Sequence, residues 1–244
     1  MSGHSHFKTI KYKKEIADNK RGKIFSKLSK AISIAAKERG GDPITNAGLR
    51  LAIEKAKECN MPKDNIERAI KKGTGELAGE QLEAMTFELF GPGGIAVIIE
   101  GITDNKNRSL GEIKQVINQN NSKLASEGAV RWMFEKKGCI VLSVEEQEKD
   151  FQDKEKLEIA AIESGAQDFK QNDDEFYVYT NPEELNQVKN KLESQGIKTN
   201  SMSLDWVAKE EIDIDPEKKN ACQKLFEGLD ELDSVQEVYS NLKN

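Results

Sequence analysis

Histidine and cysteine, which often carry catalytic or metal-binding chemistry, are scarce in this chain of 244 residues. The only histidines are His4 and His6, and the three cysteines, Cys59, Cys139 and Cys222, form no C-x-x-C pair. This scattered set argues against a disulfide framework and a zinc site, fits a reducing cytosol, and predicts three semi-buried thiols. No catalytic-triad, Cys-His, H-E-x-x-H, paired-carboxylate or nucleotide-binding signature is present. We therefore expect a protein that is not an enzyme and takes no cofactor, metal or small-molecule substrate.

Long apolar runs are also missing. No stretch approaches the 18 or so apolar residues of a membrane-spanning helix, and the first residues lack the apolar core of a signal peptide. The basic start is similar to a transit peptide, but Glu15 and Asp18 are untypical of one. We expect a cytoplasmic protein without a membrane partner.

Positive charge exceeds negative charge only in the first part of the chain. The net charge is −6, yet residues 1–72 hold 18 basic and 8 acidic residues, whereas the remainder holds 19 basic and 35 acidic. Such asymmetry predicts one module for a polyanion and another for something else. The acidic excess has two readings: ordinary solubility, or repulsion of nucleic acid from the α/β domains, so that they face protein or fold back on the basic helix.

The basic part has the periodicity of three helices. Residues 19–41 place apolar side chains at i, i+4, i+7, i+8 and i+11, and glycines with Asp42-Pro43 end the helix. A second face, roughly 80° wide, carries Lys23, Lys27, Lys30 and Lys37. We expect that face to be on the solvent side, although Ile34 intrudes on it. Residues 46–60, capped by Asn46, and 61–72, followed by Gly73, predict two shorter helices.

Beyond a polar, glycine-rich linker the pattern changes to alternating strands and helices. The predicted fold class is multi-domain α plus α/β, with a small N-terminal three-helix domain and two α/β domains that combine antiparallel sheets with helices. Residues 138–207 have the strand-helix-strand-strand-helix-strand order of a ferredoxin-like domain. The predicted domains are 1–78, basic and helical; 79–137 with 208–244, a discontinuous α/β domain; and 138–207, inserted into it.

Several ordered motifs carry a resemblance to a known family. They are "GHSHFKTIKYKK", "KRGKIFSKL", "GGDP", "NMPKDNIERAIKKG", "GPGGIAVIIEGITDNKNR" and "MFEKKG". With these motifs the chain resembles the YebC/PmpR family. The resemblance implies a helical domain followed by two α/β domains and DNA-binding transcriptional regulation. Mitochondrial relatives are translational activators, and bacterial members have been tied to the ribosome and to elongation through proline-rich stretches.

The basic leader and first helix are the main candidate site. Each lysine or arginine there can neutralise a phosphate and release a counterion, and Phe7 and Tyr12 can stack on bases. The alternative is a solvated charged face with core aromatics. Lysine predominates, which favours contact with the backbone over reading of bases. The candidate nucleic-acid-binding residues are Lys8, Lys11, Lys13, Lys14, Lys20, Arg21, Lys23, Lys27 and Lys30.

Other segments allow two interpretations each. Residues 103–114 join a strand to a helix, so Asn105, Asn107 and Arg108 form a candidate secondary anion site, unless an Asp or Asn there caps the helix and leaves Arg108 exposed. "FGPGGIA" lacks the ending of a phosphate loop and predicts a hairpin turn. The two histidines suit a hydrogen bond to phosphate or backbone better than a metal or general-base role. Residues 129–144 alternate as a strand does and predict one, in which Trp132 is expected in the core.

These features predict a nucleic-acid-binding regulator of gene expression that grips DNA or ribosomal RNA through its N-terminal domain. The family resemblance implies a DNA-binding transcriptional regulator. The alternatives are a ribosome-associated translation factor and a protein-interaction adaptor whose basic helix docks an acidic partner. We expect the α/β domains to contact the ribosome or another protein.

Overall fold

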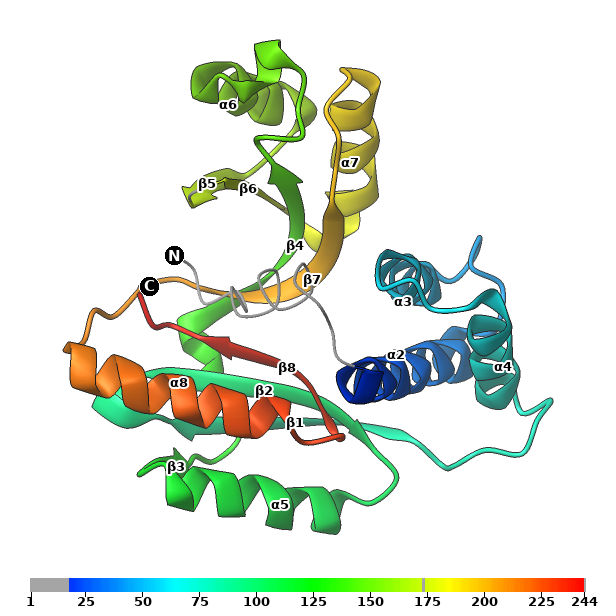
Figure 1. Cartoon of the computed structure of the whole chain (residues 1–244), viewed down its shortest axis with the longest axis vertical. Coiled ribbons are helices and arrows are strands. Elements are labelled where there is room, and N and C mark those ends of the chain that lie inside the picture. The colour runs from blue at the N-terminus through cyan, green and yellow to red at the C-terminus, as the bar shows by residue number, and fades with distance from the viewer. Residues whose placement is uncertain (1–17, 173, 244) are drawn as a thin grey trace. The chain divides into compact units, whose positions relative to one another are not determined.

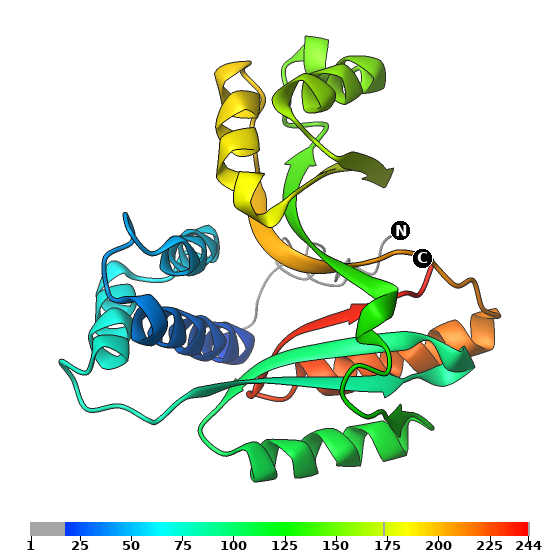
Figure 2. The same ribbon diagram turned by 180° about the vertical axis from the view of Figure 1, so that it is seen from behind.

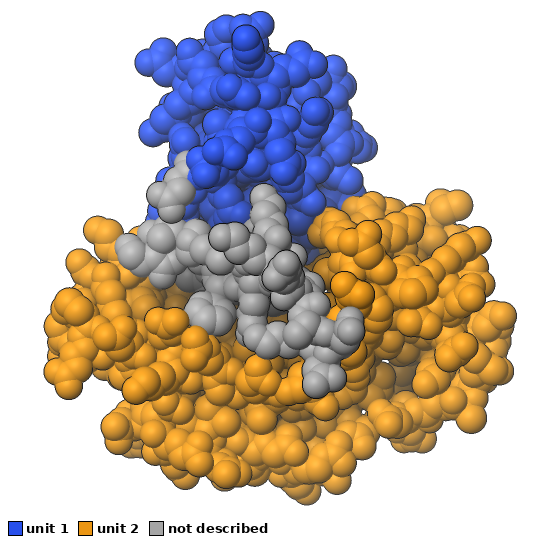
Figure 3. Space-filling view, viewed as in Figure 1, with its two compact units in different colours: residues 1, 135–207 blue, residues 2–134, 208–244 orange. Residues whose placement is uncertain are grey.

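The computed structural model describes residues 18–172 and 174–243. The chain divides into two compact units, coloured in Figure 3. Unit 1 consists of residues 135–207, and unit 2 contains the described residues on either side of it, 18–134 and 208–243. Each unit has its own sheet and is described by itself below.

The first part of unit 2 is a bundle of three helices: α2 (Asp18–Arg39), α3 (Ala47–Glu58) and α4 (Lys63–Thr74). Its core is built from Leu28 and Ile32 of α2, Leu49 of α3 and Ile66 of α4, all buried. The Asn46 side chain accepts a hydrogen bond from the Leu49 N–H at 3.0 Å and so caps α3, as its sequence position predicts.

Gly73 has a different role from the one expected. Helix α4 continues through it to Thr74, and Gly75, with φ of +83°, is the left-handed residue at the end. A Cβ at Gly73 would lie 2.3 Å from the Ser33 carbonyl oxygen. This glycine therefore allows α4 to approach α2 closely, beside the 2.8 Å hydrogen bond from the Ser33 hydroxyl to the Ala69 carbonyl.

The second part of unit 2 is a four-stranded antiparallel sheet in the order β3-β1-β2-β8. Its strands are β1 (Glu83–Phe90), β2 (Ala96–Thr103), β3 (Lys123–Leu124) and β8 (Val235–Ser240). Helices α5 (Lys106–Gln119) and α8 (Pro216–Asp230) pack against one face (Figure 1). Their buried side chains meet those of the sheet in the larger core of unit 2: Leu89, Val97, Ile99, Ile113, Ile117, Leu225 and Leu229.

The glycine-rich "GPGG" segment closes the β1–β2 hairpin through a 3-10 turn, Pro92–Gly94. Gly93 and Gly94 have φ of +76° and +78°, which other residues rarely adopt. The predicted hairpin is confirmed.

A buried carboxylate fixes the segment that leads from this sheet towards unit 1. Glu88 of β1, with 2% of its side chain exposed, accepts hydrogen bonds from the N–H groups of Gly128, Val130 and Arg131 at 2.7, 2.8 and 3.0 Å. Burial alone would raise the pKa of this carboxyl, but the three N–H donors and the Arg131 guanidinium outweigh it and lower the pKa. Glu88 is thus ionised and holds the 128–131 loop onto β1.

Trp132 follows this loop and corrects an expectation. The strand predicted around it begins only at Phe134, because residues 131–133 form a 3-10 turn. Trp132 is 66% exposed, and its indole N–H donates to the Ala129 carbonyl at 3.0 Å. The buried aromatic at this point is Phe134 instead.

Unit 1 is a ferredoxin-like domain, visible from both sides in Figures 1 and 2. Its elements are β4 (Phe134–Ser143), α6 (Lys154–Ser164), β5 (Asp168–Asn172), β6 (Glu175–Thr180), α7 (Leu185–Ser194) and β7 (Ser201–Ala208). The sheet order is β5-β6-β4-β7, that of a split βαβ motif. The predicted fold class, a helical region with two antiparallel α/β sheets, is confirmed. Among the helices of the described residues, none is long and apolar enough to cross a membrane.

Candidate nucleic-acid interface

The four lysines predicted to share a face of α2 do share one, and we call them the lysine stripe: Lys23, Lys27, Lys30 and Lys37. Three of them reach residues 230–233, which are the last residue of α8 and the turn after it, and which we call the acidic turn. Lys23 Nζ lies 2.6 Å from Glu231 Oε2, Lys27 Nζ lies 2.7 Å from the Asp230 carbonyl and 3.4 Å from its Oδ1, and Lys30 Nζ lies 3.2 Å from the Asp233 carbonyl.

Further lysines link the helical bundle to the rest of unit 2. Lys37 donates to the Leu82 carbonyl at 2.9 Å, just before β1. Lys55 of α3 donates to Glu237 Oε1 of β8 at 2.5 Å. Both extend the contact that begins at the acidic turn, so positive side chains of two helices point at the sheet of the same unit.

The expectation of a solvent-side stripe is therefore wrong for its central part. Only 14% of the Lys27 side chain is exposed, compared with 48% for Lys23. The reason is that the covering groups come from the other end of the chain, in line with the second reading of the acidic excess, in which it folds back on the basic helix. Ile34, which intrudes on the stripe, was the sequence signal for a covered face.

The acidic turn suits ammonium groups for two reasons. It holds carboxylates, and it lies at the carboxyl end of α8, where unpaired carbonyls and the helix dipole concentrate negative charge. The hydrogen bond with Glu231 raises the pKa of Lys23, so the ammonium form is favoured there. Leu232 packs against the sheet core and holds the turn in place.

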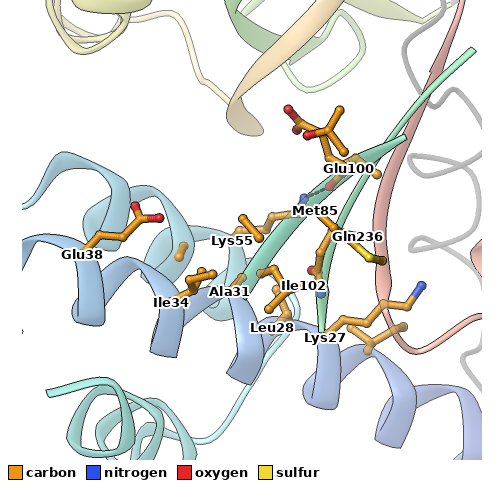
Figure 4. Close-up of a pocket in the computed structure, with 16 residues that line it drawn as sticks. Lys27, Leu28, Ala31, Ile34, Glu38, Lys55, Met85, Glu100, Ile102 and Gln236 are labelled. Carbon is orange, nitrogen blue, oxygen red and sulfur yellow. Dashed lines mark hydrogen bonds and ion pairs between the residues drawn. The ribbon is translucent and has the colours of Figure 1, made fainter. Parts of the chain in front are cut away.

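A cleft of about 470 Å³ lies between α2 and the sheet (Figure 4). Apolar side chains from both sides line it rather than fill it, among them Leu28, Ile34, Met85 and Ile102, with Lys27 and Lys55 also at its walls. The contact between α2 and the sheet thus depends on charged groups around an incompletely packed centre.

The remaining candidate nucleic-acid-binding residues lie either before the described part of the chain or at the start of α2. Lys8, Lys11, Lys13 and Lys14, with His4 and His6, lie outside the described residues. Lys20 lies in α2, and Arg21 follows it with an exposed side chain. Their contact with nucleic acid stays a prediction.

At the start of α5 the structure has the capping arrangement. Asn105 Oδ1 accepts from the Arg108 N–H at 3.1 Å, and the Arg108 guanidinium pairs with the Asp104 carboxylate. The N–H and the cation that an anion would use are therefore engaged within the protein, while Asn107 is exposed. Anion binding here stays untested.

A basic surface that sequence reasoning missed lies on α4. Arg68, Lys71 and Lys72 are exposed, and their spacing of three and four residues puts them on one side of the helix. In the part of the chain that the structure describes, none of these three side chains has an ion-pair partner. Their position close to the end of a helix hid them, because cations there also complement the helix dipole.

Comparison with known proteins assigns the chain to a family. The family model for the TACO1/YebC protein N-terminal domain matches residues 5–76, and that for the TACO1/YebC second and third domain matches residues 82–242. The chain belongs to the TACO1/YebC family. The resemblance found in the sequence motifs is thereby confirmed.

Relatives in the TACO1/YebC family match over nearly the full length. A probable transcriptional regulatory protein of Thermoanaerobacter pseudethanolicus is 47% identical, covering 100% of this chain and 97% of the relative. One of Caldanaerobacter subterraneus is 45% identical, covering 100% and 98%. The crystal structure of a conserved hypothetical protein from Aquifex aeolicus is similar with a TM-score of 0.87 and 42% identity, covering 98% of this chain and 97% of that one.

Proposed function

We propose that this chain is a non-enzymatic, cytoplasmic regulator of gene expression that binds nucleic acid through its helical bundle and the residues before it. The observation that carries the proposal is the net positive charge of residues 1–72 in an otherwise acidic protein. The names of its relatives, probable transcriptional regulatory proteins, support DNA as the target.

A second candidate is a translation factor bound to ribosomal RNA. Lysine accounts for all four cations of the stripe and for three of the four on α4. Lysine ammonium groups grip phosphate as point charges, whereas sequence reading in DNA relies more on arginine and amide side chains. This composition fits a contact with the nucleic-acid backbone or with its shape, and structured RNA is a suitable target for such a contact.

One experiment separates the candidates. The full chain is crosslinked in cells, and the bound nucleic acid is sequenced. Promoter DNA peaks would support transcriptional regulation, and peaks in ribosomal RNA would support the translation factor. Recovery of neither, together with a flat response of binding to salt in vitro, would contradict nucleic-acid binding and favour the adaptor.

A variant with Arg68, Lys71 and Lys72 changed to Gln tests whether the basic surface on α4 contacts nucleic acid. Loss of three phosphate contacts should weaken binding and reduce the salt slope by about 0.9 per contact on duplex DNA. The exposed Lys63, paired with Glu67 on the same helix, provides a control when changed to Gln.

A further inference from the structure

We propose that the acidic turn is an intramolecular competitor that occupies three lysines of the stripe, Lys23, Lys27 and Lys30, and must leave before nucleic acid can bind there. This inference rests on the proposed function, because it concerns the regulation of the same lysines. It would make the protein exist in a closed form, with the stripe covered, and an open form, with the stripe available to phosphate.

The first support is the chemistry of the contact. Lys23, Lys27 and Lys30 lie at i, i+4 and i+7, so they form a row along one side of α2. The acidic turn presents two carboxylates and three carbonyl oxygens to this row. A row of acceptor oxygens, some of them anionic, is also what a phosphodiester backbone presents, so the two ligands compete for the same ammonium groups.

The second support is that the contact is weak enough to be exchanged. Ion pairs with about half of each side chain exposed, such as that of Lys23 with Glu231, are individually weak and screened by salt. The cleft behind them leaves the apolar residues of α2 incompletely packed against the sheet. The helical bundle, by contrast, has a buried core of its own, so it can leave the sheet without unfolding.

The third support is that the two partners are anchored separately. The stripe is fixed by the bundle, whereas the acidic turn is fixed by Leu232 in the sheet core and by the hydrogen bond from the Ile102 N–H to the Ser234 carbonyl at 2.8 Å. Opening therefore breaks the contacts between the stripe and the turn, together with the bonds from Lys37 to Leu82 and from Lys55 to Glu237. It leaves both the bundle and the turn in shape. A polyanion that binds only the open form shifts the population towards it.

The test uses the full chain with Asp230→Asn, Glu231→Gln and Asp233→Asn, which we call the turn variant. Its affinity for a fluorescein-labelled duplex DNA and a structured RNA is measured by anisotropy at several salt concentrations. If the closed form predominates by about three- to tenfold, complete opening would tighten binding by about that factor. The turn variant removes the carboxylates and keeps the three carbonyl contacts, so its gain should reach up to that factor. Single Glu231→Gln, at a half-exposed position, is a milder version if the triple change disturbs α8.

Charge alone has to be controlled. The variant with Glu163→Gln, Glu210→Gln and Glu217→Gln loses the same number of negative charges from exposed positions outside the acidic turn. The proposal expects a clearly larger gain for the turn variant. It also expects that gain to vanish when Lys23, Lys27 and Lys30 are changed to Gln in the same chain.

A second readout follows the contact without nucleic acid. Acetylation by an N-hydroxysuccinimide ester, followed by mass spectrometry, should modify Lys27 slowly relative to Lys63, whose side chain is 86% exposed. In the turn variant the Lys27 rate should rise while that of Lys63 stays the same.

The outcomes are distinct. Wild-type binding with equal affinities for the turn variant and the charge control would overturn the competitor and leave the proposed function standing. An unchanged Lys27 rate in the turn variant would also overturn it. Absence of binding by wild type and turn variant alike, even at low salt, would remove the proposed function and the competitor with it.

Discussion

The Glu88 carboxylate allows a quantitative prediction of stability. Glu88→Gln keeps the shape of the side chain but replaces one acceptor oxygen with an NH₂ group that faces backbone donors. Two of the three N–H groups, those of Val130 and Arg131, bind Oε2 and the third, that of Gly128, binds Oε1. One hydrogen bond is therefore lost outright, and the other two lose their charge assistance, together with the 3.5 Å ion pair to Arg131.

From these losses we expect unfolding to become easier by about 2–4 kcal/mol at pH 7. Urea denaturation followed by tryptophan fluorescence measures the change, and Trp132 reports on the loop that Glu88 holds. The urea midpoint should fall by about 1 M or more. Glu83→Gln on the same strand is the control: it removes a half-exposed pair with Lys106, and its cost should stay below about 1 kcal/mol.

The pH dependence gives a separate check. Because the pKa of Glu88 is lower in the folded protein than in the unfolded chain, its contribution is complete above the unfolded pKa and is lost as the pH falls through the folded one. The difference in the free energy of unfolding between wild type and Glu88→Gln should stay constant from about pH 8 to pH 5 and shrink below about pH 4. A cost as small as that of Glu83→Gln, or a difference that grows on acidification, would refute the role given to this carboxylate.

Two further predictions concern packing and thiol chemistry. Gly73→Ala should destabilise the bundle by about 1–3 kcal/mol, because the new Cβ would meet the Ser33 carbonyl. Gly22→Ala in α2 should stabilise it by up to about 1 kcal/mol, because the new Cβ meets open space. The midpoints of thermal unfolding of the two variants should therefore shift in opposite directions. At pH 8 a disulfide reagent should label the half-buried Cys59 quickly, and Cys139 and Cys222 only after unfolding. Burial raises the pKa of the Cys139 thiol, and it raises the pKa of the Cys222 thiol to about 11. Rapid labelling of three thiols in the native protein would contradict this burial.

Local patterns were sufficient for most of the fold. The apolar repeat from Ile24 to Ala35, the Asn46 cap and the hairpin at "GPGG" each depend on neighbours within a few residues, and each was predicted correctly. The ferredoxin-like order of unit 1 followed from its sequence of elements.

The errors share a physical cause. Whether the face of α2 with Lys27 meets solvent is decided by Asp230, more than two hundred residues later, and no periodicity contains that information. Gly73 sits where a helix could end, but its close neighbour is Ser33 of another helix. Trp132 alternates like a strand residue, and the hydrogen bonds to Glu88 impose a turn beside it.

The insertion of unit 1 between two segments of unit 2 couples the units through the chain itself. Strands β4 and β7 are neighbours in the sheet of unit 1, and the Lys209 N–H donates to the Met133 carbonyl at 2.9 Å where the chain leaves and returns. While unit 1 is folded, the two ends of the insertion are held close together. The chain then joins α8 and β8 to the first part of unit 2 as a very short loop would. Unfolding unit 1 would replace that loop by about seventy flexible residues, roughly four doublings of length and about 2.5 kcal/mol of closure entropy. A change that only destabilises unit 1 thus also weakens the pairing of β8 with β2, through chain entropy alone.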